Sequence, residues 1–246
     1  MKISIITVCY NSAKTIEATF KSVEKQDYND IEYIVVDGGS KDDTLKLAEK
    51  YSTTISQLVS EPDKGLYDAM NKGVKLATGD YIGIVNSDDE FATSTVISEI
   101  AAFLKTNAVD ASIGNITQHR DGKLVRVYSS KRWKPEKLKI GFMPPHPSIF
   151  FKKSLFERLG YYDLNFKSGA DYELIIRYFL KNRISYAYSG ISTTSMAMGG
   201  ISSSGMSSYH LITKEICNAL KMNDIAYSKL KVQLRIFWKV WSLIKK

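Results

Sequence analysis

The first third of the chain alternates short β-branched runs with segments of helical periodicity. Residues 3–8 (ISIITV) and 31–36 (IEYIVV) have the length and composition of buried strands, and each precedes a segment with apolar residues at helical spacing. A third such run, 81–85, follows a helical segment at 68–77. This order predicts an α/β fold, Rossmann-like, with a mostly parallel central sheet and helices on both faces.

The second half of the sequence is less regular. Residues 109–116 and 124–128 alternate like antiparallel strands, 148–151 is a short apolar run, and 171–180 predicts a helix with a wide apolar face. The stretch 190–208 is rich in Ser, Gly and Thr, which predicts a long mobile loop of the kind that acts as a lid. We therefore expect a small antiparallel part beside the parallel sheet.

Polar clusters follow three of the predicted strands. Tyr10 and Asn11 follow the first, Asp37 the second, and Asp88 with Asp89 the third. Because the carboxyl ends of parallel strands meet at one edge of a sheet, we expect these clusters to share a rim where a ligand binds. A single Asp at a strand end is usually a helix cap, but three clusters together favour a ligand site.

The adjacent carboxylates Asp88 and Asp89 would repel each other at a partly buried rim unless a cation neutralised them. We expect Mg²⁺ or Mn²⁺, because hard divalent ions bind carboxylate, phosphate and water oxygens. The three histidines show no ligand spacing, and neither a P-loop nor a G-x-G-x-x-G turn offers a phosphate cradle. The metal would then hold the phosphates of a nucleotide or a nucleotide sugar.

Charge and cysteine content restrict the setting. The 246 residues include 34 Lys and Arg against 26 Asp and Glu, a net charge of +8, and six of the positive charges follow Asp224. Before this tail we recognise no basic face with interleaved aromatics, so we expect no nucleic acid partner. Cys9 and Cys217 are far apart and the opening run does not resemble a cleavable signal, so we expect a reducing cytoplasm without disulfides.

The C-terminal residues predict a basic amphipathic helix. Lys231, Arg235 and Lys239 recur every four residues on one face. The opposite face carries Leu230, Leu234, Phe237, Trp241 and Ile244, with Trp238 near the boundary. This helix is too short and charged to span a bilayer, but it fits the headgroup plane of an anionic membrane. The alternative is packing on its own domain or on a second subunit, which would allow a homodimer.

Five segments in this order and spacing resemble glycosyltransferase family 2, whose members have the GT-A fold. They are 4–11 (SIITVCYN), 34–40 (IVVDGGS), 60–73 (SEPDKGLYDAMNKG), 86–89 (NSDD) and 169–174 (GADYEL). The third is similar to a signature of enzymes that build bacterial surface polysaccharides. The likeness covers roughly residues 1–205. It implies a GT-A domain over 1–205, with a nucleotide-sugar-binding part at 1–90 and an acceptor and catalytic part at 91–205, followed by the basic helical extension 206–246.

The resemblance also implies site residues. Nucleotide-sugar binding falls to Thr7, Val8, Tyr10, Asn11, Asp37, Lys64, Gly65, Asp68, Asn71 and Asp88; the metal falls to Asp88 and Asp89, and the catalytic base is Asp171, with Glu173 in reserve. The chain departs from many relatives, which have Pro-Thr at Val8-Cys9, Arg at Met70, Asp at Asn86 and Glu at Ala170. Lys64 is then the candidate to replace the Arg contact to the diphosphate.

The activity implied is an inverting transfer of a hexose from a UDP-sugar to a hydroxyl of a lipid-linked oligosaccharide. Such a reaction would serve O-antigen, capsule or exopolysaccharide synthesis at the inner face of the cell membrane. A nucleotidyltransferase is an alternative, but it would need a Gly-rich basic loop where the chain has Tyr10-Asn11-Ser12. A catalytically inactive nucleotide-sugar-binding membrane scaffold is a second alternative. The presence of Asp88, Asp89 and Asp171 together argues against it.

Overall fold

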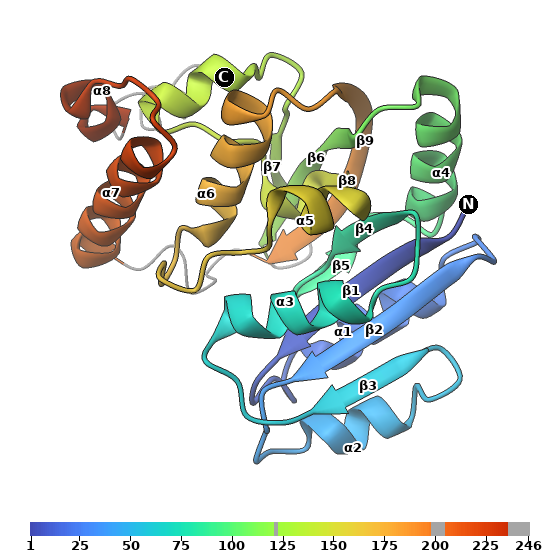
Figure 1. Cartoon of the computed structure of the whole chain (residues 1–246). Coiled ribbons are helices and arrows are strands. Elements are labelled where there is room, and N and C mark those ends of the chain that lie inside the picture. The colour runs from blue at the N-terminus through green and yellow to red at the C-terminus, as the bar shows by residue number, and fades with distance from the viewer. Residues whose placement is uncertain (121–122, 198–204, 236–246) are drawn as a thin grey trace.

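The computed structural model describes residues 1–120, 123–197 and 205–235 (Figure 1). In this part of the chain nine strands form one sheet, in the order β3-β2-β1-β4-β8-β6-β9-β5 with β7 paired to β6. The strands are β1 Ile3–Cys9, β2 Ile31–Asp37, β3 Gln57–Ser60, β4 Tyr81–Ile84, β5 Asp89–Phe91, β6 Ala111–Arg120, β7 Lys123–Tyr128, β8 Ile149–Lys152 and β9 Tyr186–Ala197. The predicted α/β class with one central sheet is confirmed.

Helices lie around this sheet. The α-helices are α1 Ile16–Glu24, α2 Thr44–Glu49, α3 Leu66–Leu76, α4 Val96–Asn107, α5 Ser154–Leu159, α6 Ala170–Ile175, α7 Gly205–Met222 and α8 Lys229–Gln233. Two short 3-10 helices, η1 Pro135–Ile140 and η2 His146–Ser148, precede β8, and the π-helix η3 Ile176–Lys181 continues α6. Together α6 and η3 form the helix that the apolar pattern of 171–180 predicts.

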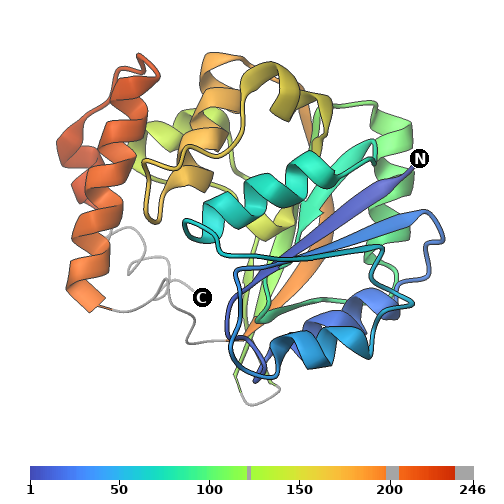
Figure 2. The ribbon, with the colours of Figure 1, turned by 60° about the horizontal axis from the view of Figure 1, so that its bottom comes forward.

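The parallel part of the sheet consists of β3, β2, β1 and β4. Alternate residues of β1 enter two different cores: Ile6 packs with α3, whereas Ile5 packs with α1. Helix α3 therefore covers one face and α1 the other, as Figure 2 shows. Gly73 allows α3 to approach closely, because a Cβ there would lie 2.5 Å from the Ile6 side chain. The predicted helices on both faces are confirmed.

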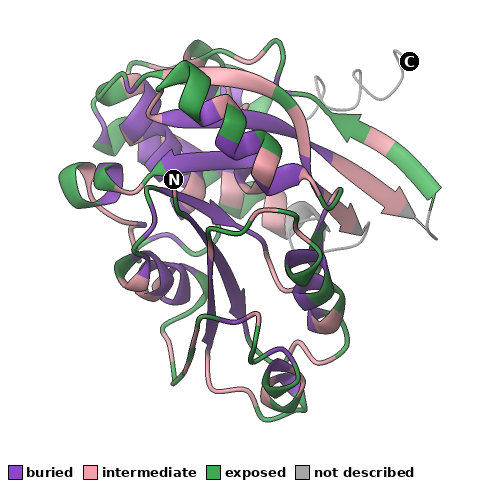
Figure 3. Ribbon diagram, turned by 90° about the vertical axis from the view of Figure 1, so that its right-hand side faces the viewer, coloured by how far each residue is buried: buried purple, intermediate pink, exposed green. Residues whose placement is uncertain are grey.

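The other half of the sheet is mixed. Strand β8 runs antiparallel to β4 and β6, β9 runs parallel to β6, and β5 returns antiparallel to β9. The predicted antiparallel pairing of the 109–116 and 124–128 segments is confirmed by β6 and β7. Figure 3 shows that the strands at the centre of the sheet are buried while β7 is largely exposed.

The prediction of a mobile loop over 190–208 is wrong for 190–197. These residues belong to β9, which lies between β6 and β5, and Thr193 and Thr194 are completely buried there. β-Branched threonines suit a pleated, buried surface even without a hydrophobic run. Residues 198–204 lie outside the described part, and α7 begins at Gly205.

The sequence Ser40-Lys41-Asp42-Asp43 has the pattern of a capping box, but no such box forms before α2. Helix α2 begins at Thr44, and no side chain caps it from Asp43. The carboxylate of Asp42 accepts bonds from the Thr44 backbone N–H (3.0 Å) and hydroxyl (2.5 Å). The hydroxyl of Ser40 is used elsewhere, in the loop after β2.

The C-terminal helices pack on the rest of the domain. For the described part of this segment, this favours packing on its own domain over lying in the headgroup plane of a membrane. Ile216 and Leu220 of α7 and Val232 of α8 belong to the same core as α6. Arg235 is 3% exposed and lies over the Tyr209 ring, 4.8 Å from its centroid. The prediction that Arg235 lies on an exposed side of the C-terminal helix is therefore wrong. Lys239 and the aromatic residues of the tail lie outside the described residues. No helix within the described ranges is long and apolar enough to cross a membrane.

Candidate active site

The loops that follow β1, β2 and β4 are tied together by hydrogen bonds. The Asn11 N–H donates to Ser40 Oγ (2.8 Å), and the Lys41 N–H donates to Asn11 Oδ1 (2.8 Å). The hydroxyls of Ser12 and Ser87 lie 3.0 Å apart. Since β2, β1 and β4 are neighbouring parallel strands, the predicted convergence of the three polar clusters on one rim is confirmed.

Asp37 is completely buried at the end of β2. Its carboxylate accepts bonds from the N–H groups of Gly39 and Ser40 (both 3.0 Å), from the Ser60 hydroxyl (2.7 Å) and from the Ser40 hydroxyl. Burial alone would raise the pKa of Asp37, but these hydrogen bonds outweigh it and lower the pKa below its ordinary value. Asp37 therefore organises its own loop as an anion, and its contact with a nucleotide stays a prediction.

Beside this loop, Tyr10 and Asp63 approach Gly38. A Cβ at Gly38 would collide with the Asp63 carboxylate and come within 3.4 Å of the Tyr10 ring. The Asp63 carboxylate also accepts the Gly65 N–H (2.7 Å), and Tyr10 is 61% exposed. The resemblance did not point to Asp63, because its signal is a contact between distant segments.

The remaining predicted donor residues divide into two groups. Lys64 and Gly65 are exposed before α3, and the Lys64 N–H donates to the half-buried Asp68 carboxylate (3.0 Å). Thr7 and Val8 are buried in β1, where Thr7 accepts a hydrogen bond from the Tyr33 hydroxyl (2.9 Å).

Asn71 is also buried, on α3, and its amide exchanges two bonds of 2.9 Å with the backbone of Tyr162. The side chains of Thr7, Val8 and Asn71 are thus buried among other residues of the domain. Their contact with a nucleotide stays a prediction.

The structure separates the two carboxylates suggested as a metal pair. Asp89 is 1% exposed, and Asn86 Nδ2 donates to its carboxylate (2.9 Å). Burial raises the pKa of Asp89 to about 7. Asp88 is exposed and has no hydrogen bond or ion pair to any described residue. Asp88 is thus the carboxylate available to an ion at the rim, whereas Asp89 lies beneath it.

These residues fit a divalent ion only together with a substrate. Among the described residues no group of three His, Cys, Asp or Glu side chains could hold a metal by itself. One exposed carboxylate completed by diphosphate oxygens and water is a usual Mg²⁺ arrangement. The donor set therefore fits an ion that binds with a nucleotide diphosphate.

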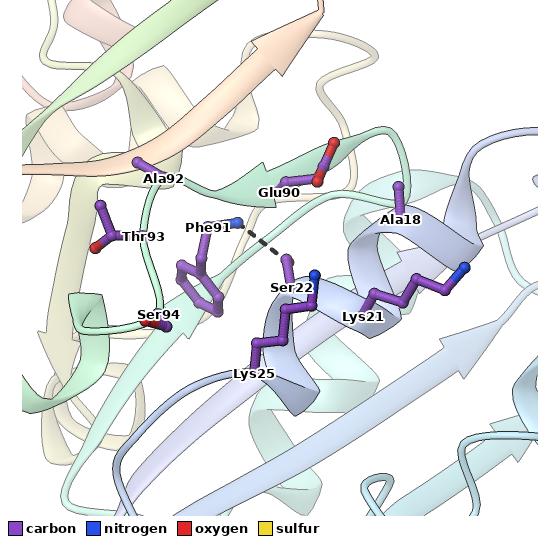
Figure 4. Close-up of a pocket in the computed structure, with 9 residues that line it drawn as sticks. All are labelled: Ala18, Lys21, Ser22, Lys25, Glu90, Phe91, Ala92, Thr93 and Ser94. Carbon is purple, nitrogen blue, oxygen red and sulfur yellow. Dashed lines mark hydrogen bonds between the residues drawn. The ribbon is translucent and has the colours of Figure 1, made fainter.

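A pocket of about 300 Å³ lies between α1 and the 90–94 segment (Figure 4). Phe91 forms part of its lining, and the Phe91 N–H donates to Ser22 Oγ (3.1 Å). Lys21, which also lines it, is paired with Glu17 on α1 (3.3 Å). This pocket contains none of the predicted site residues and is separate from the rim loops.

Asp171 lies in the first turn of α6. One carboxylate oxygen, Oδ1, accepts the Tyr172 N–H (2.7 Å) and the Tyr67 hydroxyl (3.2 Å). No hydrogen bond reaches Oδ2 from a described residue. The side chain is half-buried, and burial raises the pKa of Asp171 despite the nearby His146 and these two bonds. The geometry offers a carboxylate with a free oxygen and an increased affinity for a proton.

Aromatic side chains surround this carboxylate. The rings of Tyr67 and Tyr162 stack with centroids 5.8 Å apart, and His146 Nε2 lies 2.8 Å from the Tyr162 hydroxyl. Burial lowers the pKa of His146, which favours a neutral ring. The sequence carries no signal for His146, because this residue belongs to no ligand pattern.

Glu173 is not free to act as a reserve base. It is 4% exposed and forms a bidentate pair with Arg177 (2.8 and 3.0 Å). Asn223 Nδ2 also donates to it (3.1 Å). Arg177 in turn donates to the carbonyls of Leu159 and Tyr161. The expectation for Glu173 is corrected: it binds Arg177 of η3 and Asn223 after the end of α7.

Glu215 of α7 holds the loop in front of Asp171. Its two carboxylate oxygens accept the N–H groups of Lys167 (2.9 Å) and Ser168 (3.0 Å). Gly169 allows this approach, because a Cβ there would lie 3.0 Å from Glu215 Oε2. Only the fold brings α7 to this loop, so the sequence carries no local signal for it.

A sheet whose parallel strand ends form a polar rim, with an exposed Asp after β4 and a half-buried Asp opening a helix beyond, agrees with the GT-A fold that the sequence resemblance implies. The family model for Glycosyl transferase family 2 matches residues 4–160. The chain belongs to this family.

Curated relatives are glycosyltransferases. The uncharacterized glycosyltransferase Rv1514c of Mycobacterium tuberculosis is 34% identical over 177 residues, which is 71% of this chain and 68% of that protein. The PGL/p-HBAD biosynthesis glycosyltransferase Rv2957 of the same species is 27% identical over 96% of this chain and 90% of its own length. The Escherichia coli UDP-Glc:alpha-D-GlcNAc-diphosphoundecaprenol beta-1,3-glucosyltransferase WfaP is 32% identical over 67% of this chain and 64% of its own length.

Solved structures share the fold. Staphylococcus aureus TarS 1-349 in complex with UDP-GlcNAc superposes with a TM-score of 0.74 at 21% identity, over 96% of this chain and 72% of that chain. Against the same fragment without a ligand, the chain spans 65% of its length. The mannosyltransferase PcManGT from Pyrobaculum calidifontis, in complex with GDP-Man and Mn²⁺, gives a TM-score of 0.62 at 17% identity. At these identities the likeness establishes the fold.

Proposed function

We propose that this protein transfers a hexose from a UDP-sugar to a hydroxyl group of a lipid-linked oligosaccharide, with inversion at the anomeric carbon. The single observation that carries the proposal is the half-buried Asp171, whose carboxylate has one free oxygen and a raised pKa in the family's base position. The family membership supports the transfer, and the WfaP relative supports the kind of acceptor.

In the proposed reaction the acceptor hydroxyl attacks the anomeric carbon from the face opposite the diphosphate. The new C–O bond forms as the bond to the phosphate oxygen breaks, and that electron pair leaves with UDP. Asp171 accepts the hydroxyl proton as the attack proceeds. Tyr67 and the Tyr172 N–H hold its other oxygen, so the proton goes to the free Oδ2.

On the donor side, the Asp37 loop and Tyr10 would receive the nucleoside, and Lys64 the diphosphate. Asp88 is the residue that would hold Mn²⁺ or Mg²⁺. The ion, when bound, would neutralise charge that develops on the leaving diphosphate. Asp89 would contribute indirectly, by holding Asn86 under the loop.

A lipid-linked acceptor would require the protein to work at the membrane surface. We therefore place it at the inner face of the cell membrane as a peripheral protein, with anionic lipid attracting its basic C-terminal segment. The bacterial surface-polysaccharide setting rests on the same relative and on the 60–73 signature.

The test is an assay of the purified full chain with a panel of UDP-sugars, Mn²⁺ and a GlcNAc-diphospho-lipid acceptor. We expect one UDP-hexose to give a lipid-linked disaccharide whose new linkage has the anomeric configuration opposite to the donor's. Retention of configuration, or donor hydrolysis with no transfer to any saccharide lipid, would refute the proposal. UDP binding without turnover would favour the scaffold alternative.

A further inference from the structure

The fold brings together two basic segments that are distant in the sequence. Residues 131–139 contain five cations against one acid, Glu136. Within this stretch η1 packs against α8, and a Cβ at Gly141 would lie 2.8 Å from the Arg235 side chain. Figure 1 shows η1 and α8 next to each other at the end of the molecule. Only the fold brings residues 131–139 to the C-terminal cations, so the sequence pattern of the tail does not reveal this neighbour.

We define the basic face as seven side chains of these segments, none of them buried: Lys131, Arg132, Lys134, Lys137, Lys139, Lys229 and Lys231. None forms an ion pair with a described residue. Some lysines elsewhere are paired, as Lys153 is with Glu157 (3.3 Å). The basic face is therefore a concentration of uncompensated positive charge.

Two exposed leucines stand among these cations. Leu230 is 63% exposed and Leu234 is 39% exposed, one helical turn apart on α8. Val232 faces the core instead. A helix that presents leucines between lysines suits the boundary between headgroups and acyl chains.

We propose that the basic face, with Leu230 and Leu234, docks on the anionic surface of a phospholipid bilayer. A nucleic acid would also attract the lysines, but it offers no apolar layer for the leucines, so the lipid surface is favoured. The inference extends the proposed function, whose acceptor is lipid-anchored. Vesicle binding measures it without any sugar transfer, so the two can fail separately.

The experiment is co-sedimentation of the full chain with phosphatidylcholine vesicles, with and without phosphatidylglycerol. We expect binding to require phosphatidylglycerol and to weaken as salt screens the charges. Each basic residue near such a surface contributes about fivefold in affinity, so reversing Lys134 and Lys137 (K134E/K137E) should weaken binding by about 25-fold or more. The C-terminal segment is unchanged in this variant, so a tail-only attachment predicts no such loss.

The matched control is K46E/K50E on α2, which makes the same charge change at two other exposed lysines. It should bind vesicles within about twofold of wild type, since a surface charge away from the bilayer contributes little. Retained UDP binding and unchanged thermal unfolding establish that both variants are folded. Replacing Leu230 and Leu234 by Ser should reduce the fraction that stays bound at high salt.

Three outcomes would overturn the proposal. The first is equal vesicle binding by K134E/K137E and wild type, and the second is an equal loss in K46E/K50E. The third is tighter binding of the wild type to a single-stranded RNA than to anionic vesicles, which would make the basic face a nucleic acid surface.

Discussion

Two carboxylates of the site, Asp37 and Asp171, have opposite environments. Asp37 accepts bonds from two backbone amides and two serine hydroxyls, and its pKa is lowered. Asp171 accepts two bonds, both on one oxygen, and burial raises its pKa. A carboxylate surrounded by donors keeps its charge and shapes the backbone, whereas one with few donors can take up a proton. The contrast favours a structural role for Asp37, which holds its loop, and a proton-accepting role for Asp171.

The largest expected effect is on the Asp171 side. Asp171→Asn keeps the size of the side chain but removes the proton acceptor, so sugar transfer should fall by about 100-fold or more. Affinity for UDP should stay within about twofold, because the Asp37 loop is untouched. Initial rates and calorimetry measure the two effects. A variant that keeps more than about a tenth of the activity would show that another group takes the proton.

On the other side, Asp37→Asn should weaken UDP binding about tenfold or more, with and without Mn²⁺. The amide cannot accept every bond that the carboxylate accepts, and each donor left unpaired costs about 1–3 kcal/mol. The free energy of unfolding should fall as well. Calorimetry and urea denaturation test this.

The matched variant is Asp88→Asn, which should weaken UDP binding only when Mn²⁺ is present. EDTA should have the same effect on the wild type. Equal affinities with and without metal in the wild type would contradict the role given to Asp88.

A smaller effect is expected from the helix that supports Asp171. Glu215→Gln leaves one of the two N–H groups at Lys167 and Ser168 without its acceptor. The position of the loop before Asp171 should therefore be less firmly fixed. We expect kcat to fall about tenfold with the KM for the UDP-sugar unchanged, because misplacing a catalytic group affects the reacting geometry. Glu49→Gln on the exposed side of α2 is the control. A fall in donor affinity instead would mean that α7 supports the donor loops.

The smallest expected effect is a shift in pH dependence. Only ionised Asp171 can accept a proton, so activity should fall as the pH drops through its raised pKa, above the ordinary carboxyl value of 3.8. The Tyr67 bond favours the ionised form, so Tyr67→Phe should raise that pKa further and move the acid limb to higher pH. Profiles of kcat/KM against pH measure this. An acid limb that stays in place, or moves to lower pH, would contradict the pairing.

The parallel half of the fold was predictable because its signals are local. Strands β1 and β2 are rich in β-branched apolar residues. β2 ends at Asp37, and Tyr10 and Asn11 follow β1. β3 was missed because its residues alternate between half-buried and exposed at the sheet edge, with Gln57 and Ser60 at its ends. β9 was missed because its burial depends on partners from two other segments.

The same distinction applies to the site. The donor-side loops lie within the family segments, so the resemblance led to Asp37 and Asp88. The bonds to Asp171 come from Tyr67 of α3 and the Tyr172 N–H of α6, and the bond from Tyr67 spans 104 positions of sequence. The loop before Asp171 is held by Glu215 of α7. Glu173 looked available in the sequence because its pairing with Arg177 and Asn223 depends on helix packing.

The paired amide bonds between Asn71 and Tyr162 have a consequence for building chimaeric enzymes. They cross from the part that carries the donor loops to the part that carries Asp171, and on the Tyr162 side they use only main-chain atoms. A peptide group at position 162 offers the same donor and acceptor whatever its side chain. The acceptor-side half of another family member would therefore keep these two bonds without a compensating mutation at residue 71.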